Sequence, residues 1–91
     1  RFYYGLAQLY VEAGYYLLEL GMIDEGFMHL ENAIYYNRYD PSLIQIISQA
    51  AEYVDEPQKG IDLLRKLSPY QDSLSINRFI RNLEALESEE N

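Results

Sequence analysis

Apolar residues recur at helical spacing along most of this chain. Between residues 41 and 54, apolar positions three or four residues apart form a wide stripe along one side of a helix. The stripe consists of Leu43, Ile44, Ile47, Ala50, Ala51 and Val54. The same criterion predicts helices over about 3–20, 24–37, 41–54, 57–67 and 73–88. We therefore expect an all-α fold.

Prolines preceded by polar residues mark several predicted helix boundaries. Asp40 followed by Pro41 supplies an N-cap carboxylate and a proline for the first turn. We expect Asp55, two residues before Pro57, to repeat this device, and Pro69 to stop the fourth helix.

Gly14, Gly26 and Gly60 fall inside predicted helices. Glycine inside a helix costs about 1 kcal/mol relative to alanine, so each of these positions needs a physical reason. Because glycine has no Cβ, we expect these positions to allow two helix backbones to approach closely.

The sequence contains an internal repeat, which appears when the chain is aligned with itself so that Tyr10 matches Ile44. In this alignment small residues pair mostly with small residues, and large residues with large residues. We call this the repeat offset. The first copy carries the pattern as Tyr10, Ala13, Gly14, Leu17, Gly21, Gly26, Leu30 and Ala33. The second copy carries it as Ile44, Ile47, Ser48, Ala51, Asp55, Gly60, Leu64 and Leu67.

This spaced set resembles the tetratricopeptide repeat (TPR) family, whose unit is a helical hairpin of about 34 residues. The resemblance implies one TPR-like domain over 1–91, with repeat 1 at about 7–40, repeat 2 at about 41–74 and a capping helix at about 73–88. Arg78 and Arg81 in that last helix occupy positions that the repeat keeps apolar. A helix that ends a repeat array is expected to be apolar on the side that covers the last repeat and polar on the side that faces solvent.

The first helix also fits the beginning of a repeat in a register shifted by seven residues. That register would use Tyr3, Leu6, Ala7, Tyr10, Gly14 and Tyr16. We prefer the frame given above, because only that frame places Gly21 in the turn and Gly26 at the start of the second helix.

Charge and composition exclude several classes of function. The formal net charge of −8 argues against a nucleic-acid partner, since binding to phosphates requires Lys and Arg. Without cysteine there is no disulfide, no thiolate nucleophile and no Cys-based zinc site. No apolar run approaches the roughly 18 residues of a membrane span. The chain begins at Arg1 rather than Met, so we expect a fragment of a longer protein. The lack of cysteine leaves the compartment open, and an intracellular one is the expectation.

Candidate catalytic residues are few. His29 is the only histidine, and without a metal-binding or nucleophilic constellation we expect it on the surface of the second helix. The carboxylates Asp24 and Glu25 fall at a predicted helix start, where they complement the helix dipole. The glycines form no phosphate-binding loop. We therefore expect a non-enzymatic protein with no cofactor and no metal.

The chain is rich in tyrosine, with ten residues of this type. Eight of them lie in or beside the first two predicted helices: Tyr3, Tyr4, Tyr10, Tyr15, Tyr16, Tyr35, Tyr36 and Tyr39. These are too many for one small core, and tyrosine is enriched at protein interfaces. We therefore expect some of these tyrosines to remain on the surface.

The TPR resemblance also implies a binding face, because the first helices of successive repeats line a concave surface that holds a peptide. The corresponding positions are Gln8, Val11, Tyr15 and Leu18 in the first copy, Gln45, Gln49 and Glu52 in the second, and Phe79 and Leu83 in the terminal helix. One TPR subclass binds a C-terminal carboxylate with Lys, Asn and Arg at such positions, and this chain has no cation there. An apolar face with acidic edges at Glu12, Glu19 and Glu52 instead predicts a protein partner, a basic amphipathic helix.

Three alternative functions stay open. Residues 14–34 are similar to the single repeat of the presequence receptors of the mitochondrial outer membrane, which implies a cytosolic domain that binds basic targeting peptides. A second alternative is structural, with the aromatic first helix packing on another copy or on further repeats of a scaffold. A third is a repeat module attached to an enzyme whose catalytic domain lies elsewhere in a longer chain.

Overall fold

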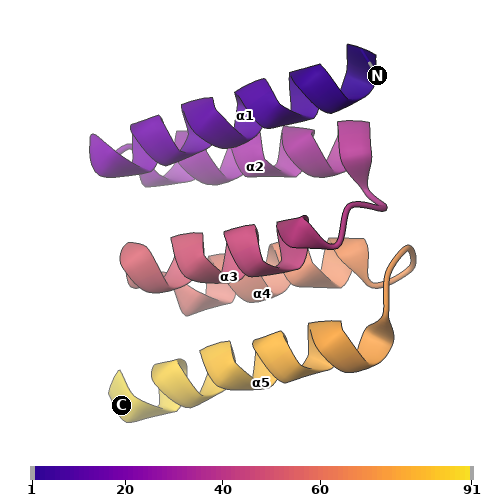
Figure 1. The fold of residues 1–91 in the computed structure, drawn as a ribbon. Coiled ribbons are helices and arrows are strands. Elements are labelled where there is room, and N and C mark those ends of the chain that lie inside the picture. Colours follow the sequence, from indigo (N-terminus) through magenta and orange to yellow (C-terminus); the bar gives the residue numbers. More distant parts are fainter. Residues whose placement is uncertain (1, 91) are drawn as a thin grey trace. The chain divides into compact units, whose positions relative to one another are not determined.

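The computed structural model of the protein describes residues 2–90 and, within them, the side chains of residues 5–89. The described chain contains five α-helices, shown in Figure 1. They are α1 (Phe2–Glu19), α2 (Ile23–Asn37), α3 (Ser42–Tyr53), α4 (Pro57–Leu67) and α5 (Ser73–Glu90). No strand occurs between residues 2 and 90, so the predicted all-α class is confirmed.

The observed helices end within two residues of the predicted boundaries. The largest difference is in α5, which continues to Glu90. The chain forms two units: Arg1–Arg38 contains α1 and α2, and Tyr39–Asn91 contains α3, α4 and α5.

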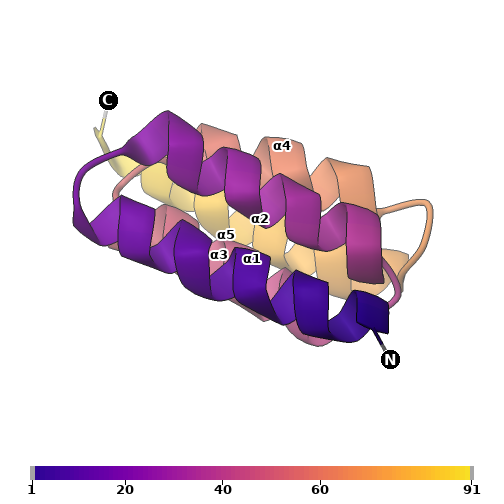
Figure 2. The ribbon, with the colours of Figure 1, turned by 90° about the horizontal axis from the view of Figure 1, so that it is seen from above.

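In the first unit, α1 and α2 form a hairpin whose helices lie side by side (Figure 2). Gly14 and Gly26 sit where the two backbones meet. A Cβ added to Gly14 would lie 3.0 Å from the carbonyl oxygen of Gly26, and a Cβ on Gly26 would lie 3.1 Å from that of Gly14. The predicted reason for these two glycines, close approach of helix backbones, is therefore confirmed.

In the second unit, α5 packs on both helices of the α3–α4 hairpin. Its core is aliphatic and consists of Leu43, Ile44, Ile47, Ala50, Ala51, Ile61, Leu63, Leu64, Leu67, Ile76, Ile80 and Leu83. Gly60 lies at the junction of the three helices, because a Cβ there would approach Ala51 Cβ to 2.5 Å and Leu83 Cδ1 to 3.0 Å. The prediction of a close approach at Gly60 is confirmed as well.

The two hairpins turn in the same way. Each connection contains one residue with positive φ, Gly21 at +82° and Asp55 at +57°. In the first turn, the N–H groups of Gly21 and Met22 donate to the carbonyls of Leu18 (3.0 Å) and Leu17 (2.9 Å). This pair of bonds around a left-handed residue is a Schellman motif, which satisfies the last carbonyls of the helix.

The second turn repeats this motif at the repeat offset, with Asp55 in the place of Gly21. The N–H of Asp55 donates to the Glu52 carbonyl at 3.2 Å, and the N–H of Glu56 donates to the Ala51 carbonyl at 2.9 Å. The predicted N-cap role of Asp55 is therefore wrong. Its left-handed backbone ends α3, and α4 begins at Pro57 without a side-chain cap.

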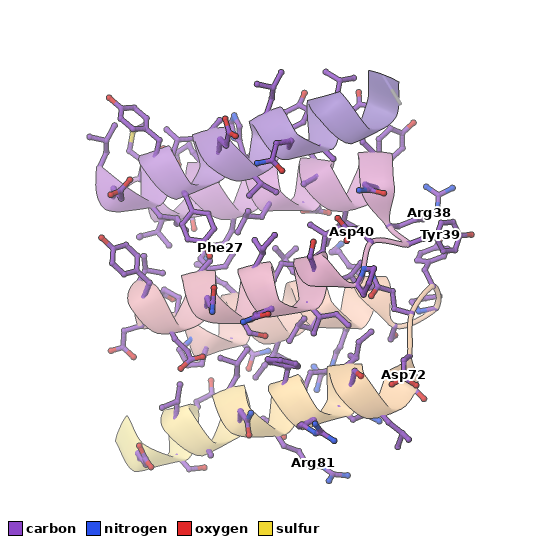
Figure 3. The ribbon with its side chains drawn as sticks, in the orientation of Figure 1. Phe27, Arg38, Tyr39, Asp40, Asp72 and Arg81 are labelled. Atoms are coloured by element: carbon purple, nitrogen blue, oxygen red, sulfur yellow. The ribbon has the colours of Figure 1, made fainter. Side chains whose placement is uncertain are left out.

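The segment before α3 is tied to the segment before α5 within the second unit. Asp40 Oδ1 accepts hydrogen bonds from the N–H (3.0 Å) and hydroxyl (2.8 Å) of Ser42, the first residue of α3. The N-cap position itself is occupied by Pro41, so the predicted N-cap at Asp40 is displaced by one residue. Gln71 Nε2 donates to the Asp40 carbonyl at 2.7 Å. The rings of Tyr39 and Tyr70 meet edge to face at 5.7 Å. Figure 3 labels Tyr39 and Asp40 before α3, and Asp72 before α5.

Candidate functional site

One face of α1 carries the predicted binding residues of the first unit. Gln8, Val11 and Tyr15 follow one another at intervals of three and four residues and therefore share a side of the helix. Gln8 is exposed, while Val11 and Tyr15 are half-buried. We call these three residues the α1 face. It offers two partly accessible apolar side chains beside one amide.

Leu18 continues the same side of α1 but is not available to a partner. Its side chain lies over Gly26, where a Cβ would approach Leu18 Cδ2 to 2.5 Å, and it is 3% exposed. The leucine fills the space that the missing glycine side chain leaves. Its predicted contact with a peptide is therefore corrected, since Leu18 belongs to the core of the first unit.

The corresponding positions of the second unit lie on α3. Gln45, Gln49 and Glu52 share one side of this helix, and all three are exposed. We call them the α3 face. At the repeat offset they correspond to Val11, Tyr15 and Leu18, so a polar face in the second unit takes the place of an apolar one in the first.

The two predicted residues of α5 differ in accessibility. Phe79 is half-buried and keeps part of its ring at the surface. Leu83 is 1% exposed and lies beside Gly60, with its Cδ1 at 3.0 Å from the position of an added Cβ. The prediction that Leu83 contacts a partner is wrong for the same reason as for Leu18: the side chain packs over a helical glycine inside its own unit.

The electrostatic setting of the α1 face is acidic. Gln8 Nε2 donates to Glu12 Oε2 at 3.0 Å, so the amide is oriented by the neighbouring carboxylate. Glu12 and Glu19 are exposed, and the sequence of α1 from residue 2 to residue 19 contains no Lys, Arg or His. Burial raises the pKa of the Tyr15 phenol.

An aromatic cluster joins α1 to α2 at the side of the hairpin. The rings of Tyr10 and Tyr36 stack with an interplanar angle of 8° and a centroid distance of 5.7 Å. Tyr35 meets Tyr36 edge-on at 5.0 Å, and His29 is tilted against Tyr10 at 5.7 Å. These contacts give several of the tyrosines a packing role.

Some of the eight tyrosines remain on the surface, as predicted: Tyr16, Tyr35 and Tyr39 are exposed, although Tyr35 also contacts Tyr36. Tyr53 and Tyr70 are exposed as well. The predictions for Tyr3 and Tyr4 lie outside the described side chains. Exposed Leu9 and Tyr16 on α1 were not among the predicted site residues, although their spacing of seven residues could have indicated a shared face.

His29 forms a local contact. Its Nδ1 lies 2.9 Å from the carbonyl oxygen of Glu25, and because a carbonyl only accepts, this bond places a proton on Nδ1. Within residues 2–90, no group of three or more His, Cys, Asp or Glu side chains is arranged to hold a metal ion. None of the described helices combines the length and the apolar character of a membrane span.

Comparisons with known proteins add no relative: no protein-family model, no curated protein and no solved structure matches this chain.

Proposed function

We propose that the chain is a TPR-like module of two helical hairpins with a capping helix, and that it binds a protein segment without catalysing a reaction. Two features within the hairpins support the repeat. The Schellman turn recurs at the repeat offset, and a glycine occupies the fourth residue of both α2 and α4 at a close helix approach.

The binding surface in this proposal is the α1 face, and its partner is an amphipathic helix with basic edges. The observation that carries the proposal is the pair of half-exposed apolar side chains, Val11 and Tyr15, on a helix whose charged side chains between residues 2 and 19 are both acidic. Leucines of the partner would bury apolar area on this pair. Lys or Arg at the edge of the partner would approach Glu12.

The α3 face can contribute polar contacts but not apolar anchors. Gln45 and Gln49 carry amides that donate and accept hydrogen bonds, and Glu52 carries a negative charge. In protein interfaces a few buried apolar or aromatic anchors supply most of the binding energy. We therefore assign the anchors to Val11 and Tyr15.

A titration with a fluorescently labelled basic amphipathic peptide tests this function. Fluorescence anisotropy should show saturable binding, and a scrambled peptide of identical composition should bind at least about tenfold more weakly, because its apolar side chains no longer share one face. Raising the salt concentration from about 0.05 M to about 0.5 M should weaken binding severalfold as the acidic edge is screened.

Two α1 variants and one control locate the surface. Val11→Asp should weaken binding at least about tenfold, and the smaller change Val11→Thr should weaken it about threefold. The control is Met28→Asp, an exposed apolar position on α2, which should leave affinity unchanged. Circular dichroism of each variant confirms that the helices are intact. Equal binding of the two peptides, or equal affinity of the wild type and Val11→Asp, would refute the proposal.

A further inference from the structure

A second surface of α1 lies on the side opposite Gly14 and α2. It is a stripe at alternating intervals of four and three residues, formed by Gly5, Leu9, Glu12, Tyr16 and Glu19. We call it the outer stripe of α1. All five residues are exposed, including Leu9 at 61% and Tyr16 at 62%. Large apolar side chains exposed in a row are typical of an interaction surface.

Gly5 distinguishes this stripe from an ordinary surface. Gly14, Gly26 and Gly60 each stand where another part of the same unit approaches the helix, whereas a Cβ at Gly5 would meet no described atom within 4 Å. A glycine in a helix destabilises it by about 1 kcal/mol relative to alanine, and no described part of the chain compensates for that cost at Gly5. Close approach of a second molecule would compensate for it.

A matching stripe runs along α5. At the same alternating intervals it carries Leu74, Arg78, Arg81, Ala85 and Ser88. We call it the outer stripe of α5. These five residues are exposed and lie opposite the buried Ile76, Ile80 and Leu83. Figure 3 shows Arg81 projecting from α5 away from α3 and α4.

The two stripes are complementary in length and in charge. Each spans the same number of residues, which corresponds to about 21 Å of helix. The charged members of the α1 stripe are Glu12 and Glu19, and those of the α5 stripe are Arg78 and Arg81.

We propose that the outer stripe of α1 binds the outer stripe of α5 of a second copy of this chain. The third residue of one stripe meets the third residue of the other whether the two helices run parallel or antiparallel, so Glu12 faces Arg81 in both arrangements. Leu9 and Tyr16 then pack beside this ion pair. Because the two surfaces are different, each contact leaves the second stripe of both copies available for the same contact, either with a further copy or within a closed assembly.

Sedimentation at about 0.15 M salt tests the assembly, because the long-range repulsion between chains of net charge −8 is then screened to about 8 Å while contacting pairs persist. The average mass should rise from the monomer value of 10.7 kDa as the protein concentration increases. A mass that stays at the monomer value to about millimolar concentration, where only weak contacts remain undetected, would overturn the proposal. Association that persists unchanged in the Glu12→Arg, Glu19→Arg variant would indicate a different contact and would also overturn it.

Charge-reversed variants provide the sharper test. Glu12→Arg with Glu19→Arg makes both stripes positive, and Arg78→Glu with Arg81→Glu makes both negative, so each variant alone should remain monomeric. An equimolar mixture again pairs opposite charges and should recover the association of the wild type. Failure of the mixture to associate would refute the charge pairing.

Two further variants test whether self-association uses the outer stripe of α1. Leu9→Asp should abolish self-association, and Met28→Asp, at a similarly exposed apolar position on α2, should leave it unchanged. Both substitutions are at exposed positions, where effects on folding are usually within about 0.5 kcal/mol. If the wild type binds a basic amphipathic peptide through Leu9 but does not self-associate, the occupant of the stripe is another protein, and the proposed copy-to-copy contact is wrong.

Discussion

The two hairpins of this chain share a backbone design but differ in the chemistry that they present. Both turn through a Schellman motif with a left-handed residue, and both place a glycine at the fourth residue of the second helix. Yet Val11 and Tyr15 on α1 are half-buried and apolar, and Gln45 and Gln49 on α3 are exposed amides. The backbone is therefore set by small residues and turn geometry, while the outer side chains are free to diverge.

The two hairpins also differ in the helices that pack against Gly26 and Gly60. Gly26 faces α1 alone within its unit, whereas Gly60 faces both α3 and α5. The extra helix covers the α3–α4 hairpin and contributes Leu83 to its core. Three pairs of substitutions compare the hairpins at equivalent positions, and a further variant tests the start of α5, in order of decreasing expected effect.

Core truncation should cost the two hairpins a similar amount. Leu30 and Leu64 are equivalent at the repeat offset and are 1% and 0% exposed. Leu30→Ala and Leu64→Ala should each lower the free energy of unfolding by about 2–5 kcal/mol, because each leaves a cavity. Urea denaturation measures both. A cost near zero for one of them would mean that its hairpin is not packed as described.

Filling the helical glycines should affect the second hairpin more than the first. The Cβ of Gly60→Ala would collide with Ala51 Cβ, which is fixed to the α3 backbone, and overpacking of this kind costs about 2–3 kcal/mol. The nearest atoms to the Cβ of Gly26→Ala belong to the Leu18 side chain, which can rotate, so we expect about 1 kcal/mol. Thermal unfolding of the two variants tests this prediction. A larger loss of stability for Gly26→Ala than for Gly60→Ala would contradict the packing described at these glycines.

The turn residues should respond with opposite signs. Gly21→Ala places a Cβ on a residue with φ of +82° and should destabilise the protein by about 1 kcal/mol. Asp55→Gly relieves a φ of +57° and should stabilise it by about 0.5 kcal/mol. Chemical denaturation of both variants tests the shared motif. Destabilisation by Asp55→Gly would show that the Asp55 side chain has a role beyond the turn.

The start of α5 should respond to acid. Hydrogen bonds from the Ser75 hydroxyl and N–H lower the pKa of Asp72 below its ordinary value of 3.8. The stabilisation from this depressed pKa is complete above that value and is lost as pH falls through the lower pKa of the folded state. Asp72→Asn keeps an acceptor but no charge. The difference in urea midpoint between wild type and Asp72→Asn should shrink between pH values of about 6 and about 2, and a constant difference would contradict this assignment.

The helices could be predicted closely from the sequence because their apolar periodicity and flanking prolines act locally. The site was harder to predict, because accessibility depends on which side chains fill the space beside a glycine. Leu18 and Leu83 both fill such spaces, and no pattern in either helix alone reveals that. Asp55 was misassigned because aspartate suits both an N-cap and a left-handed turn. The alignment of Asp55 with Gly21 at the repeat offset could have indicated the left-handed turn.

The central claim is that the apolar anchor for a partner lies on the first hairpin and not at the equivalent position of the second. The most direct test is the affinity for one basic amphipathic peptide of Val11→Asp and of Gln45→Asp, which introduce the same charge at positions equivalent by the repeat offset. We expect a loss of at least about tenfold for Val11→Asp and less than about threefold for Gln45→Asp. Equal losses, or a larger loss for Gln45→Asp, would contradict the account.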